Sequence, residues 1–335
     1  GYDNIELPSQ MRMSVNATPA PEPEAVRSII SNFLAANGFV ETMNNSLTKG
    51  DYYNGLTTYP SDHCVKILNP LSQDLNVLRQ TLVLNALEVV AYNVNRQMPY
   101  LKIFEYGSVY QRLPEKNGET LEGYEEHQNF CLAITGVSEK NWRGGGVRTD
   151  YFKLKGYVEL LLRRFGADIY QLWSEPAPGD IYSEGMSLKL PGSGKLLLTM
   201  GQVNASLAKK FGVKQPVYVA EINWQTLFEL IKRNKVGFKE LPRFPEVRRD
   251  LALLLDEQVT YAQLRISAFK SAKKILKNVS LFDVYRGDKI PQGKKQYALS
   301  FTLQDAERTL TDQDVEKAMS SILKSFQSEF GAQLR

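Results

Sequence analysis

Four lysines near the C-terminal end of the chain have a spacing suited to binding a polyanion. They follow the helical pattern i, i+3, i+4 and i+7: Lys270, Lys273, Lys274 and Lys277. A helix is expected there because Thr260 and Gln263 form a capping box, and it would run to about Lys277. On that helix the four side chains would form one basic stripe, which either pairs with phosphates or is a solvated face.

Aromatic side chains follow this stripe along the chain. Phe282 and Tyr285 lie on or beside an expected strand, where their rings can stack on unpaired bases. Tyr297 alternates with Leu299 and Phe301, so it is expected to pack inside the protein instead.

The residue types needed for metal or nucleophilic chemistry are scarce. His63 and His127 are the only histidines and have no ligand spacing, which argues against a zinc site or a histidine-based triad. Cys64 and Cys131 are far apart in sequence and are expected to be reduced. The adjacent His63 and Cys64 are interpreted as an incidental pair.

Two glycine-containing segments could be either ligand-binding loops or structural turns and loops. Residues 191–195 read PGSGK, but Leu196 follows the lysine where a phosphate-binding loop needs Ser or Thr. Strands are expected on both sides, so this segment is predicted to be a hairpin turn. Residues 143–146 read RGGG and are expected to form a mobile loop, with contact to RNA or a partner left open.

Composition and charge are those of an ordinary globular protein. Of 335 residues, 43% are hydrophobic and 23% are charged. The formal net charge is +4, and residues 239–335 hold the whole excess, with 17 Lys and Arg against 13 Asp and Glu. No apolar run approaches the roughly 18 residues of a membrane span, and no signal peptide is recognisable. We expect a cytoplasmic protein, and the start at Gly1 suggests an excised fragment.

Apolar periodicity predicts an α+β fold with two domains after a tail and linker at residues 1–20. Within 21–238 the expected elements are helices at about 26–37, 75–95, 151–165 and 224–233, and strands at 39–47, 100–110 and 129–135, with several short antiparallel strands in 168–223. The helix at 75–95 is apolar on more than one face. It is therefore expected to lie deep in its own core or to be buried partly by another chain.

Residues 239–335 predict a second domain with the element order βαββαβ. Its strands are expected at 251–255, 279–285, 296–303 and 331–335, and its helices begin at Thr260 and at a second capping pair, Thr311 and Asp314. This order is typical of a ferredoxin-like domain.

Three segments resemble the beta subunit of bacterial phenylalanyl-tRNA synthetase. They are LNPLSQDLNVLR at 68–79 with the helix after it, LKIFEYG at 101–107, and the last domain with RRDLAL at 248–253, LFDVYRG at 281–287 and GAQLR at 331–335. The first two are similar to the first and second signatures of class II synthetases. Residues 1–5, GYDNI, resemble the end of the preceding domain of that subunit.

The resemblance implies a class II-like module without catalytic residues. An active site of this class uses an Arg two residues before the Glu of its second signature, and that position is Ile103 here. The third signature is also missing, so the charge on a transferred phosphate has no stabiliser. Catalysis with ATP and Mg²⁺ is expected in a separate alpha subunit. This fragment would hold no metal, since the magnesium ligands would lie upstream of Gly1.

The resemblance also implies residues for recognition and assembly. Ala252 would leave room for a base, Asp283 would accept hydrogen bonds from its edge, and Tyr285 would stack or hydrogen-bond. A position that is often Ser in the family is Gln296, whose amide can still read a base. The lysine stripe and Arg286 would contact the tRNA backbone. The first signature forms dimers in this class, which suggests a subunit interface at Leu78, Arg79, Leu82 and Asn93.

The sequence therefore predicts a non-catalytic part of a phenylalanine-tRNA ligase beta subunit. Residues 21–238 would form the inactive class II module, which packs on alpha subunits in an (αβ)₂ heterotetramer, and residues 239–335 would bind the tRNA-Phe anticodon. Three alternatives stay open: a self-sufficient monomeric synthetase, a structural interaction module without RNA binding, and a small-molecule or metal-binding protein.

Overall fold

The structure is a computed structural model that describes residues 22–335 except 71, 117–119, 140–141, 235, 239 and 288–289, together with Asn4 and Gln10. The predicted tail and linker at residues 1–20 therefore lie almost entirely outside the described residues. The chain divides into two compact units between Val236 and Gly237, close to the boundary expected between residues 238 and 239.

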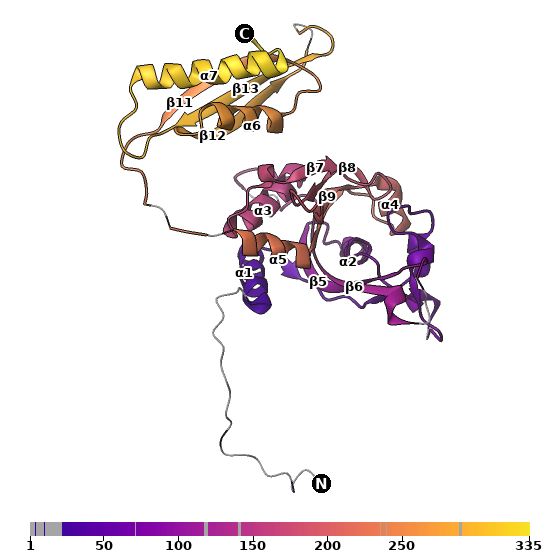
Figure 1. The fold of residues 1–335 in the computed structure, drawn as a ribbon. Helices are drawn as coiled ribbons and strands as arrows, with labels where there is room; N and C mark the ends of the chain where they lie inside the picture. The colour runs from indigo at the N-terminus through magenta and orange to yellow at the C-terminus, as the bar shows by residue number, and fades with distance from the viewer. Residues whose placement is uncertain are drawn as a thin grey trace. The chain divides into compact units, whose positions relative to one another are not determined.

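The N-terminal unit is built around a seven-stranded sheet (Figure 1). In spatial order the strands are β1 (Val40–Glu41), β5 (Leu101–Arg112), β6 (Tyr124–Thr135), β10 (Val217–Asn223), β9 (Leu196–Val203), β8 (Tyr182–Lys189) and β7 (Trp173–Pro176). Only β1 and β5 pair in parallel among these neighbours, and the other pairs are antiparallel. The mainly antiparallel sheet agrees with the predicted α+β fold. The β8–β9 connection contains residues 191–195, so the predicted hairpin turn is confirmed.

Each face of this sheet buries its own apolar core. Strand β6 alternates, with Leu132 and Ile134 in one core and Cys131 and Ala133 in the other. The first core is closed by α1 (Pro23–Ala36), α3 (Tyr151–Arg164) and α5 (Trp224–Arg233). The second is closed by α2 (Val83–Val94), α4 (Ala205–Lys210) and a small sheet of β2 (Leu47–Thr48), β4 (Val77–Leu78) and β3 (Val65–Lys66). Short 3₁₀ helices lie at Gly50–Tyr53, Ser61–His63, Gln73–Leu75, Leu121–Gly123 and Ile169–Gln171.

The predicted helix at residues 75–95 is wrong in its first third. The chain forms a 3₁₀ turn and strand β4 before α2 begins at Val83, because backbone amides in this stretch bond to distant partners. The Gln80 amide donates to the Tyr53 hydroxyl at 2.9 Å, and the Leu82 amide donates to the Glu221 carboxylate at 2.8 Å. The strand expected at 39–47 is likewise reduced to its two ends, β1 and β2.

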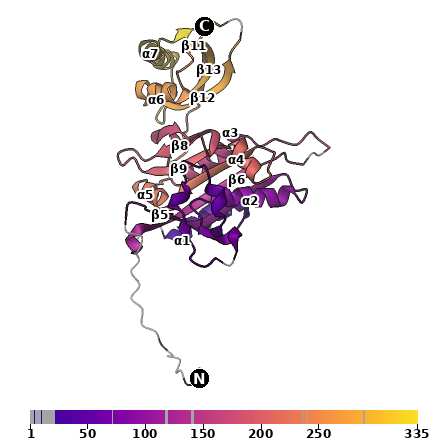
Figure 2. The same cartoon turned by 90° about the vertical axis from the view of Figure 1, so that its right-hand side faces the viewer.

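The C-terminal unit is a four-stranded sheet. Figure 2 shows α6 and α7 on the same side of its strands. Its sheet order is β12 (Leu276–Tyr285), β13 (Lys294–Leu303), β11 (Val247–Asp256) and β14 (Gln333–Leu334), and its helices are α6 (Tyr261–Ser271) and α7 (Asp312–Phe330). The predicted βαββαβ order is confirmed. Both predicted capping boxes are present, at Thr260 with Gln263 and at Thr311 with Asp314.

The predicted extension of the first helix to Lys277 is wrong. Helix α6 ends at Ser271, a turn follows, and β12 begins at Leu276. The helical spacing of the lysines is overridden because Leu276 and Val279 are both buried in the core of the unit. The apolar side chains, rather than the charged ones, decide where the helix ends.

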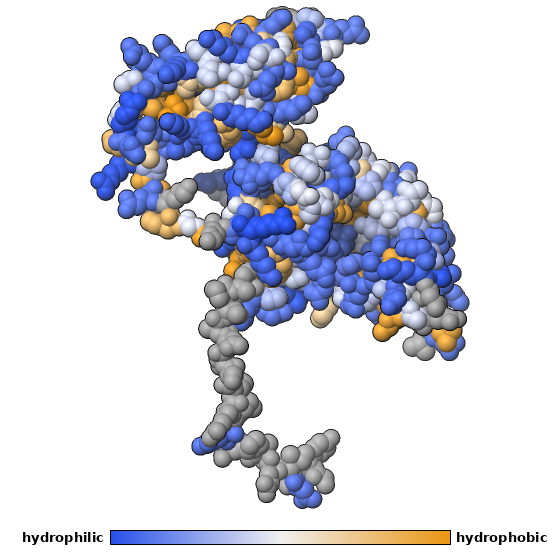
Figure 3. Space-filling view, viewed as in Figure 1, coloured by the Kyte–Doolittle hydropathy of each residue, from blue (hydrophilic) through white to orange (hydrophobic). Residues whose placement is uncertain are grey.

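Hydrophilic residues cover most of the visible face in the space-filling view (Figure 3). In the part of the chain that the structure describes, no helix has both the length and the apolar character needed to cross a membrane.

Candidate functional site

The sheet of the C-terminal unit has one face packed against α6 and α7 and one face without helices. In β13, Tyr297, Leu299 and Phe301 are buried in the core with the helices. Because side chains alternate along a strand, Gln296 and Ala298 point to the opposite face. The prediction that Tyr297 packs inside is thereby confirmed, since only 8% of it is exposed.

Four predicted recognition residues lie together on this helix-free face. Tyr285 of β12 pairs with Gln296 of β13. In the next row, Asp283 of β12 pairs with Ala298, which in turn pairs with Ala252 of β11. Residues directly opposite one another in antiparallel strands point to the same side of the sheet. The face thus has a floor of two alanines beside a carboxylate, a phenol and an amide.

A β-bulge turns Asp283 and Tyr285 toward this face. Val279 and Leu281 point into the core, so strict alternation would send residue 283 into the core as well. The register shifts between Leu281 and Asp283, and the extra residue, Phe282, reverses the alternation. Phe282 is left 55% exposed beside the face.

Arg335 is a fifth member of this group, which the sequence pattern did not predict. The amide of Arg335 donates to the Ala252 carbonyl at 3.0 Å, which extends the β11–β14 pairing. Its guanidinium Nη1 donates to Gln296 Oε1 at 2.6 Å. The sequence predicted a terminal strand at 331–335, and that strand brings a cation to the amide that is expected to read a base.

A second polar group, also missed, lies further along the same face. Arg248 Nε donates to Ser300 Oγ at 2.6 Å and to Asp250 Oδ1 at 3.3 Å. The hydrogen bond from the Ser300 hydroxyl, with that from Arg248, lowers the pKa of the Asp250 carboxyl. The helix-free face is therefore polar well beyond the four predicted residues.

The predicted lysine stripe does not exist as a feature of one helix. Lys270 lies in the last turn of α6, Lys273 and Lys274 lie in the following turn, and Lys277 lies in β12. The first three line a common hollow of about 630 Å³, and Lys277 does not. Arg286, the fifth predicted backbone contact, forms an ion pair with Glu257 at 2.6 Å.

In the N-terminal unit, residue 103, where an active class II site would have an arginine, is buried away from solvent. The Ile103 side chain is 5% exposed and packs in the apolar core under α2. The neighbouring Glu105 is bound by Arg79, whose Nη1 lies 2.7 Å from Oε1, and by the amide group of Asn44. Both partners of this ion pair are almost completely buried.

The predicted interface residues divide into two kinds. Arg79 and Leu82 are 3% and 0% exposed, so their side chains contact this chain rather than the solvent. Leu78 and Asn93 are partly exposed. The neighbouring apolar residues Leu68 and Tyr92 are much more exposed and were not predicted.

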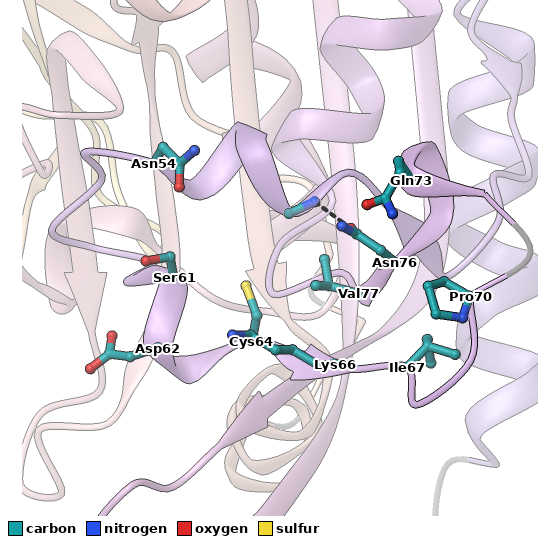
Figure 4. Close-up of a pocket in the computed structure, with 11 residues that line it drawn as sticks. Asn54, Ser61, Asp62, Cys64, Lys66, Ile67, Pro70, Gln73, Asn76 and Val77 are labelled. Atoms are coloured by element: carbon teal, nitrogen blue, oxygen red, sulfur yellow. Dashed lines mark hydrogen bonds between the residues drawn. The ribbon is translucent and has the colours of Figure 1, made fainter.

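A polar hollow of about 510 Å³ lies beside the small three-stranded sheet (Figure 4). Asp62, Lys66, Gln73 and the Cys64 thiol line it, and Asn76 Oδ1 accepts a hydrogen bond from the Gly50 amide. Burial raises the pKa of the Cys64 thiol, which keeps it in the weakly nucleophilic protonated form. Within the described residues no group of three or more His, Cys, Asp or Glu could hold a metal ion.

Comparison with known proteins accounts for both units. Residues 7–224 match the family model described as phenylalanyl tRNA synthetase beta chain CLM domain, and residues 242–335 match the ferredoxin-fold anticodon binding domain. Phenylalanine–tRNA ligase beta subunits from Bacteroides fragilis, Bacteroides thetaiotaomicron and Porphyromonas gingivalis are 41%, 40% and 40% identical over the whole of this chain. The chain spans 41% of the length of each of these relatives.

A likeness to a solved structure is much weaker. Pyrrolysyl-tRNA synthetase from Desulfitobacterium hafniense aligns with 64% of this chain and 71% of that chain, at a TM-score of 0.47 and 13% identity. A likeness at that level carries no argument about function.

Proposed function

Because this chain belongs to the phenylalanyl-tRNA synthetase beta chain family, we propose that it assembles with the alpha subunit and binds the anticodon of tRNA-Phe. The whole enzyme would be an (αβ)₂ heterotetramer in the cytoplasm that attaches phenylalanine to tRNA-Phe with ATP and Mg²⁺. This chain would contribute recognition and assembly, and no catalytic residue.

One observation carries the recognition role: the strand register places Ala252, Asp283, Tyr285 and Gln296 on one helix-free face. The two alanines of the floor, Ala252 and Ala298, leave space for a flat base. The Asp283 carboxylate can accept hydrogen bonds from ring and amino N–H groups, and the 39% exposed Tyr285 can stack. Flat, unpaired bases are the ligands that such a combination suits.

The test is a titration of the chain with tRNA-Phe and with the same tRNA carrying a swapped anticodon, at two salt concentrations. We expect tighter binding of the native anticodon, with Asp283→Ala reducing that preference by about 5-fold to 160-fold, since a base-edge contact discriminates by about 1–3 kcal/mol. Asp312→Ala is the matched control, because it removes a 96% exposed carboxylate from α7 of the same unit, away from the helix-free face.

Two results would contradict anticodon recognition. One is equal binding of both tRNAs by the unaltered chain with strong salt dependence, which would mean a purely electrostatic contact. The other is an Asp283→Ala chain that keeps the full preference. No binding of either tRNA would favour a structural interaction module.

The assembly role is supported by exposed apolar residues around the first signature segment. Leu68 is 93% exposed, and Tyr92 on α2 is 58% exposed. Exposed apolar side chains that gather on one surface can mark a contact with another chain. Leu68 and Tyr92 belong to the segment that resembles the dimer-forming first signature, and Leu121 does not. We expect Leu68→Asp to weaken association with the alpha subunit in sedimentation experiments. Leu121→Asp, at a 90% exposed position elsewhere in the unit, is the matched control and should assemble normally.

The absence of catalysis from this chain is supported by the closed environment of Ile103. The cation that would hold a nucleotide phosphate is replaced by an apolar side chain inside the core. Residue 103 therefore offers no cation to a nucleotide phosphate, and in this proposal ATP and Mg²⁺ bind in the alpha subunit. Aminoacylation by this chain without the alpha subunit would contradict the proposal and favour a self-sufficient synthetase.

A further inference from the structure

The hollow that contains three of the predicted lysines has five cations in its lining. It has a volume of about 630 Å³ and lies between the end of α6, the following turn and the first half of α7. Its cations come from three separate segments: Lys270, Lys273, Lys274, Arg308 and Lys317. We call this hollow the basic groove.

The lysines of the basic groove are not neutralised by the protein. Within the described residues, Lys270, Lys273, Lys274 and Lys317 have no ion-pair partner, and all four are exposed. The carboxylates of Asp305 and Asp314 also line the groove, and each already accepts hydrogen bonds from other groups of the protein. The Asp305 carboxylate accepts from the Glu307 amide at 2.9 Å, and the Asp314 carboxylate accepts from the Thr311 amide at 3.1 Å and binds Arg308 at 3.0 Å.

The shape and floor of the groove suit a sugar–phosphate chain. Five cations against two carboxylates give the lining an excess of positive charge. A concave surface with a charge excess concentrates its potential on a counter-ion more strongly than a flat one does. Leu310, Ala272 and Ala318 are about nine-tenths buried and form part of the lining, which gives sugar rings an apolar surface. The Arg308 guanidinium is held in place by Asp314, so it is oriented before a ligand arrives.

The basic groove is separate from the face proposed to hold the anticodon bases. Its lining comes from α6, α7 and the loops that join them to the sheet, whereas Asp283, Gln296 and Ala252 lie on the sheet face without helices. Bases bound on that face cannot also occupy the groove.

We infer that the basic groove is a second RNA site, which binds the phosphate backbone of a segment other than the anticodon bases. The site reads charge and not sequence, because Lys273, Lys274 and Lys317 present ammonium groups, which are point charges on flexible stems. This inference rests on the RNA-binding role proposed above, but it assigns a different surface and a different kind of contact.

The test compares two double substitutions in the full chain that each remove two positive charges. Lys273→Gln with Lys317→Gln alters the groove. Lys324→Gln with Lys209→Gln is the matched control, at exposed lysines outside it. Affinities for tRNA-Phe, for its anticodon-swapped form and for poly(U) are measured over a range of salt concentrations.

For the groove variant we expect weaker binding of all three RNAs and a slope of log K against log salt that is shallower by about 1.5 than in the control. Its preference for the native anticodon should be unchanged. Asp283→Ala should do the reverse, losing the preference and keeping the slope, so the two proposals fail separately. A groove variant that binds all three RNAs as the control does would overturn the inference.

Discussion

Gly107 of β5 lies directly against the guanidinium of Arg79. A Cβ atom added at residue 107 would stand 2.1 Å from Arg79 Nη2 and 3.0 Å from Leu82 Cδ2. The guanidinium has no free space to move into, because it is 3% exposed, bonds to Glu105 and donates through Nε to the Ser108 carbonyl at 2.9 Å. Glycine at this position therefore permits the buried ion pair.

We predict that Gly107→Ala destabilises the N-terminal unit by about 2–4 kcal/mol, because separating a buried ion pair leaves a charge unpaired. Chemical unfolding followed by tryptophan fluorescence measures this, since Trp142, Trp173 and Trp224 all lie in that unit. Gly144→Ala is the control, as nothing lies within 4 Å of its added Cβ. Equal stabilities of the two variants would show that Arg79 can move without cost.

A larger side chain on the alanine floor of the helix-free face should weaken RNA binding and leave the free energy of unfolding nearly unchanged. Ala252 lies beside Ala298, and a leucine at residue 252 would fill the space proposed for a base. We expect Ala252→Leu to weaken tRNA-Phe binding at least about tenfold, or roughly 1.4 kcal/mol. The free energy of unfolding should change by less than about 0.5 kcal/mol, as is usual for surface substitutions.

The comparison variant for this experiment is Thr302→Leu, which adds a similar apolar group on the same face in the row of Arg248. Unchanged binding by Thr302→Leu together with weak binding by Ala252→Leu would locate the base at the alanine floor. If both bind alike, the floor is not the site.

The sequence predicts which side of β13 lacks helices, but it does not predict which side chains of β12 lie on that side. The alternation of Tyr297, Leu299 and Phe301 predicts which side of β13 faces the helices. The same rule applied to β12 would send Asp283 into the core. The bulge at Phe282 prevents this, and a bulge depends on pairing between strands that the local sequence does not specify.

Both wrong helix boundaries have the same physical origin. At residues 75–82 and 272–277 the side chains have helical spacing, which local propensity favours. Tertiary contacts override it: the Leu82 amide bonds to Glu221 in one case, and Leu276 is buried in the other. The basic groove is consequently formed by three segments that no periodic pattern in the sequence links.

The contact between Arg335 and Gln296 predicts coupled effects on RNA binding. If the guanidinium fixes the orientation of the Gln296 amide, then Arg335→Ala releases that amide and removes most of its contribution. We expect each of Arg335→Ala and Gln296→Ala to weaken tRNA-Phe binding several-fold. The double variant should be little weaker than Arg335→Ala alone, with an interaction energy of about 0.5–1.5 kcal/mol in a double-mutant cycle. Additive effects would mean that the two residues act independently.

The cap of α7 predicts a response of the C-terminal unit to acid. Hydrogen bonds from the Thr311 hydroxyl and amide, with one from Arg308, lower the pKa of the Asp314 carboxyl to about 2. Because the pKa is lower in the folded chain than in the unfolded one, the carboxylate stabilises the fold above pH 4, and this contribution is lost as the pH falls from about 4 to 2.

We therefore expect Asp314→Asn to flatten the decline in stability over that range, because the uncharged side chain has no proton to gain. Hydrogen exchange of the buried α7 residues Ile322 and Phe326, corrected for the pH dependence of intrinsic exchange, reports on this unit in the full chain. Asp312→Asn, at a carboxylate that is 96% exposed in the same turn, is the control and should keep the original decline. A decline in Asp314→Asn as steep as in the control would mean that another carboxyl governs acid unfolding, since only a group with a depressed pKa can produce the loss.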